Sequence, residues 1–176
     1  MKRPLWFFIV LSVAAAPALA EESPAISVGF SPSSNHDALN VVLNTINDAK
    51  KSIDVAAYVF TSKPVARALV EAKGKGIFVR VVADEKSNKN KYTAVTYLAN
   101  HGIPVRLNNR YSIMHNKTIV ADGHTVQTGS FNYTSSADKS NAENAIAIKN
   151  VPELASQYEA EFNRLWDEST PLKANY

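Results

Sequence analysis

The sequence predicts an α/β fold with a mixed, largely parallel β-sheet that is flanked by helices. Two nearly continuous apolar runs, 53–60 and 77–84, have the length and composition of strands that are covered on both faces. A helical pattern separates the two runs, so together they predict a βαβ unit with parallel strands. The pair Asp122-Gly123, between two further strand-like runs, predicts a tight β-hairpin.

The first twenty residues lie outside this predicted domain. The basic pair Lys2-Arg3 precedes an apolar run over 5–15, and Ala18-Leu19-Ala20 has the pattern of a cleavage site. We therefore interpret 1–20 as a signal peptide and 21–176 as a single domain that is exported from a bacterium, to the periplasm or beyond. The apolar run is too short to span a bilayer as a helix, so we expect no membrane anchor in the mature chain.

Composition restricts how the mature chain can act. Without Lys2 and Arg3 the 19 basic residues fall to 17, against 16 acidic residues, so no general positive field attracts nucleic acid. An anionic substrate must then be bound by local clusters of cations. The sequence contains no Cys, so stability must come from a hydrophobic core, which a chain of this length is able to form.

Helix caps and apolar spacing predict the other elements. Helices are expected after Ser33-Ser34-Asn35, after Thr61-Ser62, over 92–100 and from Pro152; strands are expected at 103–107, on both arms of the hairpin, and at 145–148. In the last helix, apolar residues from Leu154 to Trp166 recur on one face, which predicts that this helix docks on the sheet.

The first hairpin arm carries the residues most suited to chemistry. His115, Lys117 and Asp122 follow one another in the order His-x-Lys-x4-Asp. If this arm is a strand throughout, its side chains alternate between the two faces, so His115 and Lys117 point the same way. A base or nucleophile would then lie beside a fixed cation. Such a pair on a strand, taken alone, is also compatible with an ordinary solvated face.

The residues after the hairpin extend this pattern. Gly129-Ser130-Phe131-Asn132 follows the turn, and Asn141-Ala142-Glu143-Asn144 comes next. Together with His-x-Lys-x4-Asp, these motifs resemble the signature of the phospholipase D superfamily, and the single copy is similar to its small bacterial endonucleases. The resemblance covers nearly the whole chain after residue 25 and implies a phospholipase D-like fold. Because the superfamily's active site contains two such motifs, the single copy implies a C2 homodimer.

The resemblance also implies a role for each residue of the motifs. A neutral His115 would attack phosphorus and form a phosphohistidine, while the protonated His115 of the other subunit acts as general acid and later as base. Lys117, Asn132 and Ser130 would hold the non-bridging oxygens, and Glu143 would accept a hydrogen bond from His115. Asp122 is expected to have only a supporting role in the chemistry, because its position as the first residue of the Asp-Gly turn already gives it a sufficient structural role. No cofactor and no metal are expected.

A polar segment, 85–91, follows the second buried strand and contains Lys86, Lys89 and Lys91. The carboxyl end of a parallel strand is where open α/β sheets bind ligands, so these lysines are candidates for contacts with a phosphate backbone. A solvated loop is the alternative interpretation of the same segment.

The sequence therefore favours a sequence-nonspecific endonuclease that cleaves DNA, with RNA left open as a second substrate. Phospholipid hydrolysis by the same mechanism is the alternative within enzymes, and a non-catalytic nucleic-acid-binding module is the alternative from another class. A metal site made of His115, Asp122, His124 and Glu143 is disfavoured, because His124 lies beyond the turn and the neighbouring lysines repel a cation. A serine hydrolase is disfavoured because no Gly-x-Ser-x-Gly surrounds Ser130.

Overall fold

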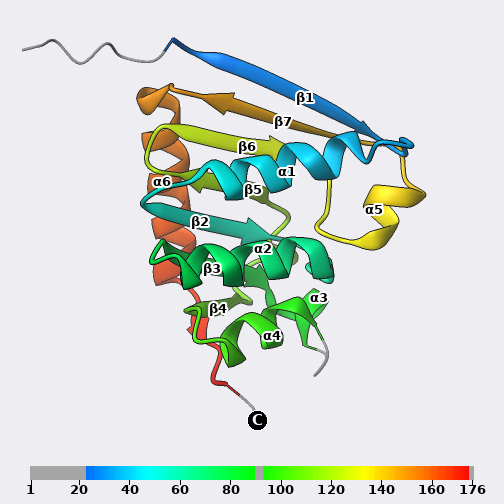
Figure 1. Ribbon diagram of the computed structural model, residues 1–176. Coiled ribbons are helices and arrows are strands. Elements are labelled where there is room, and N and C mark those ends of the chain that lie inside the picture. Colours follow the sequence, from blue (N-terminus) through cyan, green and yellow to red (C-terminus); the bar gives the residue numbers. More distant parts are fainter. Residues whose placement is uncertain (1–22, 90–92, 175–176) are drawn as a thin grey trace, which may run out of the picture.

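The computed structural model of this protein describes residues 23–89 and 93–174 (Figure 1). The predicted signal peptide and Lys91 lie outside the described residues. Within these ranges all strands belong to one eight-stranded sheet, whose order is β1-β7-β6-β5-β2-β3-β4-β8. Within the same ranges, no helix has the length and apolar character needed to cross a membrane.

The strands and helices have the following bounds. The strands are β1 Ala25–Ser31, β2 Ser52–Ala57, β3 Phe78–Asp84, β4 Val105–Asn108, β5 Lys117–Ala121, β6 Thr125–Gly129, β7 Glu143–Lys149 and β8 Thr170–Pro171. The helices are α1 Asp37–Asp48, α2 Lys63–Gly74, α3 Glu85–Asn88, α4 Ala94–Asn100, α5 Ser135–Lys139 and α6 Pro152–Asp167. The βαβ unit, the hairpin and the long last helix are thus confirmed, while β1, α5 and β8 were not predicted.

The mixed α/β character is confirmed, but the prediction of a largely parallel sheet is wrong. Only β2 with β3 and β3 with β4 pair in parallel. The other pairs, β1 with β7, β2 with β5, β4 with β8, β5 with β6 and β6 with β7, are all antiparallel. The physical reason is that β5 and β6 form a tight hairpin, which can join only antiparallel strands, and β7 and β1 continue outward from it in the same manner.

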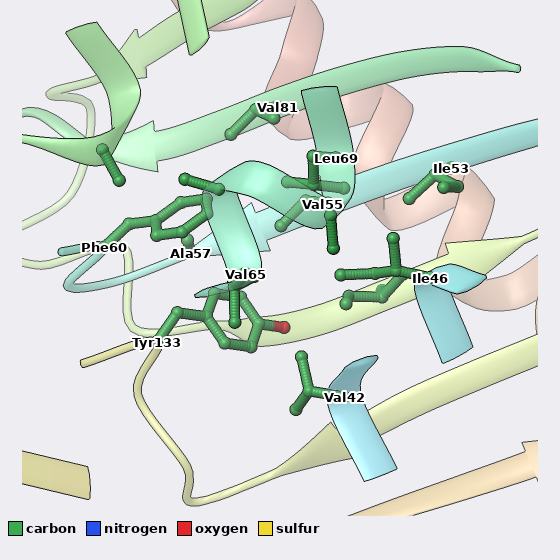
Figure 2. Packing of buried hydrophobic residues seen from close by; sticks show 14 of the residues in the cluster. Val42, Ile46, Ile53, Val55, Ala57, Phe60, Val65, Leu69, Val81 and Tyr133 are labelled. Carbon is green, nitrogen blue, oxygen red and sulfur yellow. The ribbon is translucent and has the colours of Figure 1, made fainter. Parts of the chain in front are cut away.

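Helices cover both faces of the sheet (Figure 1). The main core lies between the sheet and helices α1 and α2, where branched side chains interdigitate around Ile46, Val55 and Leu69 (Figure 2). On the other face α6 packs on strands β2 to β6, and Phe162 and Leu165 meet Val82 there. Strand β1 lies at the edge beyond this helix, and its Ile26, Val28 and Phe30 are 69%, 56% and 62% exposed.

The segment after β3 is not the loop that its polar composition predicted. It forms the short helix α3, because the carboxylate of Asp84 accepts a hydrogen bond from the backbone N–H of Ser87 at 2.8 Å and so caps the first turn. Asp84 is itself 1% exposed. The cap therefore fixes the direction in which the chain leaves the carboxyl end of β3.

Candidate active site

The hairpin that carries the His-x-Lys pattern is present, with a two-residue turn. Asp122 and Gly123 have φ angles of 57° and 70°, and the N–H of His124 donates to the carbonyl of Ala121 at 3.2 Å. Two left-handed residues in succession define the type I′ turn that matches the twist of the strands. The strand itself begins only at Lys117, which pairs with Ala57 of β2.

The prediction that His115 lies on the strand is therefore wrong. His115 belongs to the loop that leads into β5, and its backbone has no place in the ladder with β2. The loop is held by the preceding residue instead: the N–H of Met114 donates to Asp84 at 3.0 Å, and the Met114 side chain is buried against α6. His115 is exposed as a result, whereas Lys117 is only 6% exposed.

His115 and Lys117 nevertheless meet, and Tyr58 joins them. The Lys117 ammonium donates to the carbonyl of His115 at 2.7 Å and lies 5.1 Å from the centre of the Tyr58 ring. The imidazole packs edge-on against the same ring, with centroids 4.6 Å apart and an interplanar angle of 62°. Burial lowers the pKa of Lys117, and the negative charge of Glu143 partly opposes that shift. The ammonium keeps two N–H donors for another acceptor.

An open cavity of about 300 Å³ lies beside this pair. His115 and Lys117 line it together with Thr128 and Gly129 at the end of β6 and Tyr158 of α6. A larger cavity of about 950 Å³ lies around Asp122 and His124, at the opposite end of β5. We place the candidate active site at the smaller cavity, because both residues of the His-x-Lys pair line it.

The Gly-Ser-x-Asn segment reaches the same end of the sheet. A Cβ on Gly129 would lie 2.3 Å from the carbonyl oxygen of Asn144, so only glycine allows β6 to approach β7 this closely. The Ser130 hydroxyl accepts from the backbone and side-chain nitrogens of Asn144, at 3.1 and 3.3 Å. Its own proton remains available for donation.

Asn132 is held in place by its neighbours. Phe131 and Tyr133 on either side are fully buried in the main core. The side-chain oxygen of Asn132 is buried and has no hydrogen-bond partner among the described residues. A buried polar atom without a partner costs about 1–3 kcal/mol. Such an atom is typical of a site where another group completes the arrangement.

Glu143, the first residue of β7, contacts different groups from those expected. Its carboxylate accepts from the side-chain amide of Asn141 at 3.1 Å. Within the described part of the chain no hydrogen bond joins Glu143 to His115, so the expected anchoring of the imidazole does not occur inside one subunit. Its negative charge favours the charged form of Lys117 instead and partly opposes the lowering of the Lys117 pKa by burial.

Asp122 lies at the far end of the five-residue strand β5, away from His115. Its carboxylate accepts from the backbone N–H groups of Lys50, Lys51 and Ser52 at 2.7, 2.7 and 2.9 Å. Burial acts to raise the pKa of Asp122, but these three hydrogen bonds outweigh it, so the pKa is lowered. This side chain anchors the segment between α1 and β2.

The separation along β5 also bears on the metal site considered above. Asp122 and His124 lie at one end of the hairpin, and His115 and Glu143 at the other, so the four side chains do not converge. Among residues 23–89 and 93–174, no group of three or more His, Cys, Asp or Glu side chains is arranged to hold a metal ion.

The lysines of the polar segment have partners of their own. The Lys86 ammonium donates to the carbonyl of Ser112 at 3.2 Å, in the loop before His115. Lys89 forms an ion pair with Glu85 at 3.0 Å, one helical turn earlier. Lys86 is thus tied to the candidate site through the backbone, whereas the charge of Lys89 is already paired.

Sequence reasoning missed Tyr58, Asp84 and Asn88. The apolar run 53–60 predicts that Tyr58 belongs to a continuous buried strand, but β2 ends at Ala57. Asp84 and Asn88 are 1% and 2% exposed, yet polar residues after a strand ordinarily indicate a solvated turn. The spacing Asp-x-x-x-Asn, which fits a cap followed by a helical turn, is the one signal that the sequence offered.

Comparison with known sequences places residues 42–166 in the family described as "Cardiolipin synthase, PLD-like domain". A protein of Rickettsia bellii named Phospholipase D is 35% identical over 133 residues, which are 76% of this chain and 65% of that protein. The Mitochondrial cardiolipin hydrolase of Xenopus laevis is 33% identical over 139 residues, which are 79% of this chain and 66% of that protein. The matched segment thus spans slightly less than two thirds of these relatives.

Two solved structures have the same fold. The phospholipase D family member Nuc from Salmonella typhimurium aligns with a TM-score of 0.83 and 39% identity, over 86% of this chain and 100% of that one. NucT from Helicobacter pylori aligns with a TM-score of 0.76 and 26% identity, over 85% of this chain and 100% of that one. The fold, the His-x-Lys arrangement and the family match agree, and this chain belongs to the phospholipase D superfamily.

Proposed function

We propose that this protein is a phosphodiesterase that hydrolyses DNA without sequence specificity, through a phosphohistidine intermediate in an active site shared by two subunits. The observation that carries the proposal is that the exposed His115 and the nearly buried Lys117 lie together: the Lys117 ammonium binds the backbone carbonyl of His115, the ammonium and the imidazole both lie against the Tyr58 ring, and the two residues line one cavity. A phosphodiester needs a nucleophile on phosphorus and a cation on its non-bridging oxygens. This pair supplies both groups.

In the first step a nitrogen of neutral His115 forms a bond to phosphorus as the bond to the leaving oxygen breaks. The proton for that oxygen comes from the partner's His115, which starts in its protonated form. In the second step water attacks phosphorus, the partner's His115 takes a proton from the water, and the bond between phosphorus and nitrogen breaks. Both imidazoles return to their starting states, so the cycle balances without a cofactor.

Other residues have supporting roles in this proposal. The two remaining N–H donors of Lys117, the hydroxyl proton of Ser130 and the side-chain NH₂ of Asn132 would donate to the non-bridging oxygens. Glu143 would hold Lys117 in its charged form, because its negative charge opposes the effect of burial on the pKa of that lysine. Lys86 and Lys89, together with Lys91 outside the described residues, are proposed contacts for the phosphate backbone.

The shared site requires a homodimer, and the open face of β1 supports one. Ile26 lies opposite Ile148 and Val28 opposite Ile146 across the pair of β1 with β7, so these apolar side chains form one patch on the face where α6 packs further along the sheet. Towards the candidate site the patch ends at the exposed Phe30, which pairs with Asn144, the residue whose side chain binds Ser130. A second copy that covers it would bring its own His115 toward the first.

DNA is preferred to lipid as the substrate for two reasons. The two structures that this chain covers over their full length are named Nuc and NucT. A groove of about 440 Å³ lies between α2 and α4, and the exposed cations Lys63 and Arg67 line it. Thr61, which also lines this groove, follows Tyr58 by three positions in the sequence. Cations along a groove suit a polyanionic chain. Phospholipid hydrolysis stays the alternative, because the curated relatives are named Phospholipase D and Mitochondrial cardiolipin hydrolase.

The test incubates the purified protein with plasmid DNA, RNA, and vesicles of phosphatidylcholine or cardiolipin, with His115→Ala as the control. We expect plasmid nicking that His115→Ala abolishes, and no comparable release of lipid headgroup. Lipid turnover without DNA cleavage would replace the proposed substrate. Binding of DNA with no cleavage by either protein would support a non-catalytic module.

Mixing wild-type and His115→Ala chains tests the shared site. A mixed dimer has either the nucleophile or the acid but never both, so activity should follow the square of the wild-type fraction, and an equal mixture should retain about a quarter of the activity. Independent sites would instead make the activity proportional to the wild-type fraction, so an equal mixture would retain about half of the activity. A Val28→Glu variant, which places a charge in the apolar patch, should be monomeric in sedimentation and inactive.

A further inference from the structure

We infer that Asp84 and Asn88, two buried polar residues behind the cavity, are positioning residues that hold His115 and Tyr58 in their mutual contact. This inference rests on the proposed role of His115 as the nucleophile. Neither side chain belongs to the His-x-Lys, Gly-Ser-x-Asn or Glu-Asn motifs. Both are almost inaccessible to solvent, so they act through the backbone segments that they bind.

Asn88 extends the sheet beyond the point where β2 ends. The backbone pairing of β2 with β3 stops at Ala57 opposite Ala83. Past that point the Asn88 side chain donates to the carbonyl of Tyr58 at 2.6 Å and accepts from the N–H of Phe60 at 3.1 Å. A carbonyl and an N–H two residues apart point to the same side of a strand. The Asn88 amide therefore occupies the position of the missing backbone unit of β3.

The same amide also donates to the carbonyl of Asp84 at 2.8 Å. Three of its four hydrogen-bonding capacities are thus used, all on backbone groups. Because a buried amide so fully bonded has no freedom to rotate, the backbone of Tyr58 is fixed relative to the end of β3. The Tyr58 ring then has a defined place against the imidazole of His115 and the ammonium of Lys117.

Asp84 fixes the other segment of the site. One carboxylate oxygen accepts from the N–H of Ser87 and the other accepts from the N–H of Met114, at 2.8 and 3.0 Å. Within the described residues, no cation pairs with this carboxylate, so its two oxygens serve backbone groups alone. Met114 immediately precedes His115, and the Lys117 ammonium binds the His115 carbonyl from the other side. The reactive residue is therefore held on both sides along its backbone.

Asn88 and Asp84 are linked to each other. The Asn88 side chain donates to the backbone carbonyl of Asp84, and the Asp84 carboxylate accepts from the N–H of Met114. A change in either should shift the Tyr58 segment and the His115 loop relative to one another. In a phosphoryl transfer the angle of attack is decisive, and a displacement of about 1 Å can cost about 100-fold in rate. Binding of the polyanion, in contrast, depends on surface cations and should be nearly unaffected.

The test uses variants of the full-length protein that keep the size of each side chain. Asp84→Asn places an NH₂ opposite one of the two backbone N–H groups, and Asn88→Asp places an oxygen opposite the carbonyls of Tyr58 and Asp84. Asp54→Asn is the matched control, because Asp54 is also buried at 6% exposure but bonds to Arg80 near the start of β2. Each variant is compared with wild type for kcat, KM and midpoint of urea unfolding.

We expect kcat to fall about 10- to 100-fold in Asp84→Asn, with KM within about 2-fold of wild type. Asp54→Asn should lose stability with kcat within about 2-fold. If Asn88→Asp does not fold, Asp84→Asn still decides the question. A folded Asp84→Asn with wild-type kcat, or an equal fall of kcat in Asp54→Asn, would overturn the inference.

A spectroscopic readout separates this inference from the proposed function. The sequence has four His, so the NMR signal of the His115 ring is identified by its loss in His115→Ala. Contact with the Tyr58 ring should displace that signal, and Asp84→Asn should move it toward the value of a free imidazole while Asp54→Asn leaves it unchanged. This result is expected even if the wild-type protein cleaves no DNA. An unmoved signal in Asp84→Asn would refute the positioning role alone.

Discussion

Replacement of Asp122 by Asn should cost stability and leave catalysis nearly intact, although Asp122 belongs to the His-x-Lys-x4-Asp motif. The carboxylate binds three backbone N–H groups that precede and open β2, at the end of β5 away from His115. Asn tolerates the left-handed φ of 57° at this position, so the substitution does not add backbone strain. The effect of the lost charge can therefore be measured separately.

The magnitude follows from the contacts. In the Asn variant one oxygen can still accept from Lys51 and Ser52, but each charge-assisted bond becomes a neutral one, at a loss of about 1 kcal/mol apiece. The N–H of Lys50 would face an NH₂ and turn to water, at a loss of up to about 1 kcal/mol. Since the site is partly exposed and screened by solvent, we expect about 2 kcal/mol in total.

Urea unfolding followed by circular dichroism measures this loss. With a slope of about 2 kcal/mol per molar urea, the midpoint should fall by about 1 M at pH 7. Because the folded-state pKa of Asp122 is lowered, its stabilising effect is complete above the unfolded pKa of about 3.9 and disappears as the pH falls through the folded value. The difference between variant and wild type should therefore shrink below about pH 4.

Asp48→Asn is the control for this experiment. Its carboxylate is 63% exposed and pairs with Lys149 on the surface, so its loss should cost less than about 0.5 kcal/mol. The reasoning would be refuted by an Asp122→Asn protein with wild-type stability and greatly reduced kcat. Such a result would mean that the carboxylate acts on the reaction from a distance that the present geometry does not explain.

Three further predictions concern the reactive end of the strand. Lys117→Met should abolish cleavage without loss of stability at pH 7. Because burial lowers the pKa of Lys117 in the folded state, wild type should gain stability as the pH rises toward the unfolded pKa of about 10.5, and the Met variant should not. Urea unfolding of both proteins at pH 7 and pH 10 measures this difference. Cleavage should persist in excess EDTA, since the chemistry needs only the imidazoles and the ammonium; loss on chelation with recovery on adding Mg²⁺ or Zn²⁺ would contradict this. The rate of DNA cleavage should be bell-shaped in pH, with two constants that belong to the pair of imidazoles, whereas a steady rise into alkaline pH would indicate attack by hydroxide.

The parts of the fold that the sequence predicted are those with a local signal. Asp122-Gly123 specified the hairpin because few residues other than Asp, Asn and Gly adopt two left-handed conformations in succession. The pairing of distant strands has no such signal. Strand β1 alternates apolar and small residues, but only its register with β7 decides that Ile26 and Val28 face outward.

The candidate site was predicted in part for the same reason. His115, Lys117, Ser130 and Asn132 were identified from motif spacing, and the structure brings Lys117 into contact with the backbone of His115. Asp84 and Asn88 carry no motif, and their role depends on contacts with residues 28 to 30 positions away in the chain. Tyr58 was overlooked because an aromatic residue after an apolar strand is most simply a continuation of the core.

The spacing of the motif itself has a structural explanation. Four residues separate Lys117 from Asp122, and strand β5 occupies the interval from Lys117 to Ala121. At about 3.3 Å per residue, the two side chains are then about 16 Å apart along the strand. One end of β5 thus carries Lys117, whose ammonium binds the carbonyl of His115, and the other end holds the segment that starts β2, the strand that pairs with β5. Strand β2 in turn leads to Tyr58, whose ring contacts His115 and Lys117. The Asp122 anchor at the other end of the hairpin therefore helps to set the register of β2, and with it the position of Tyr58.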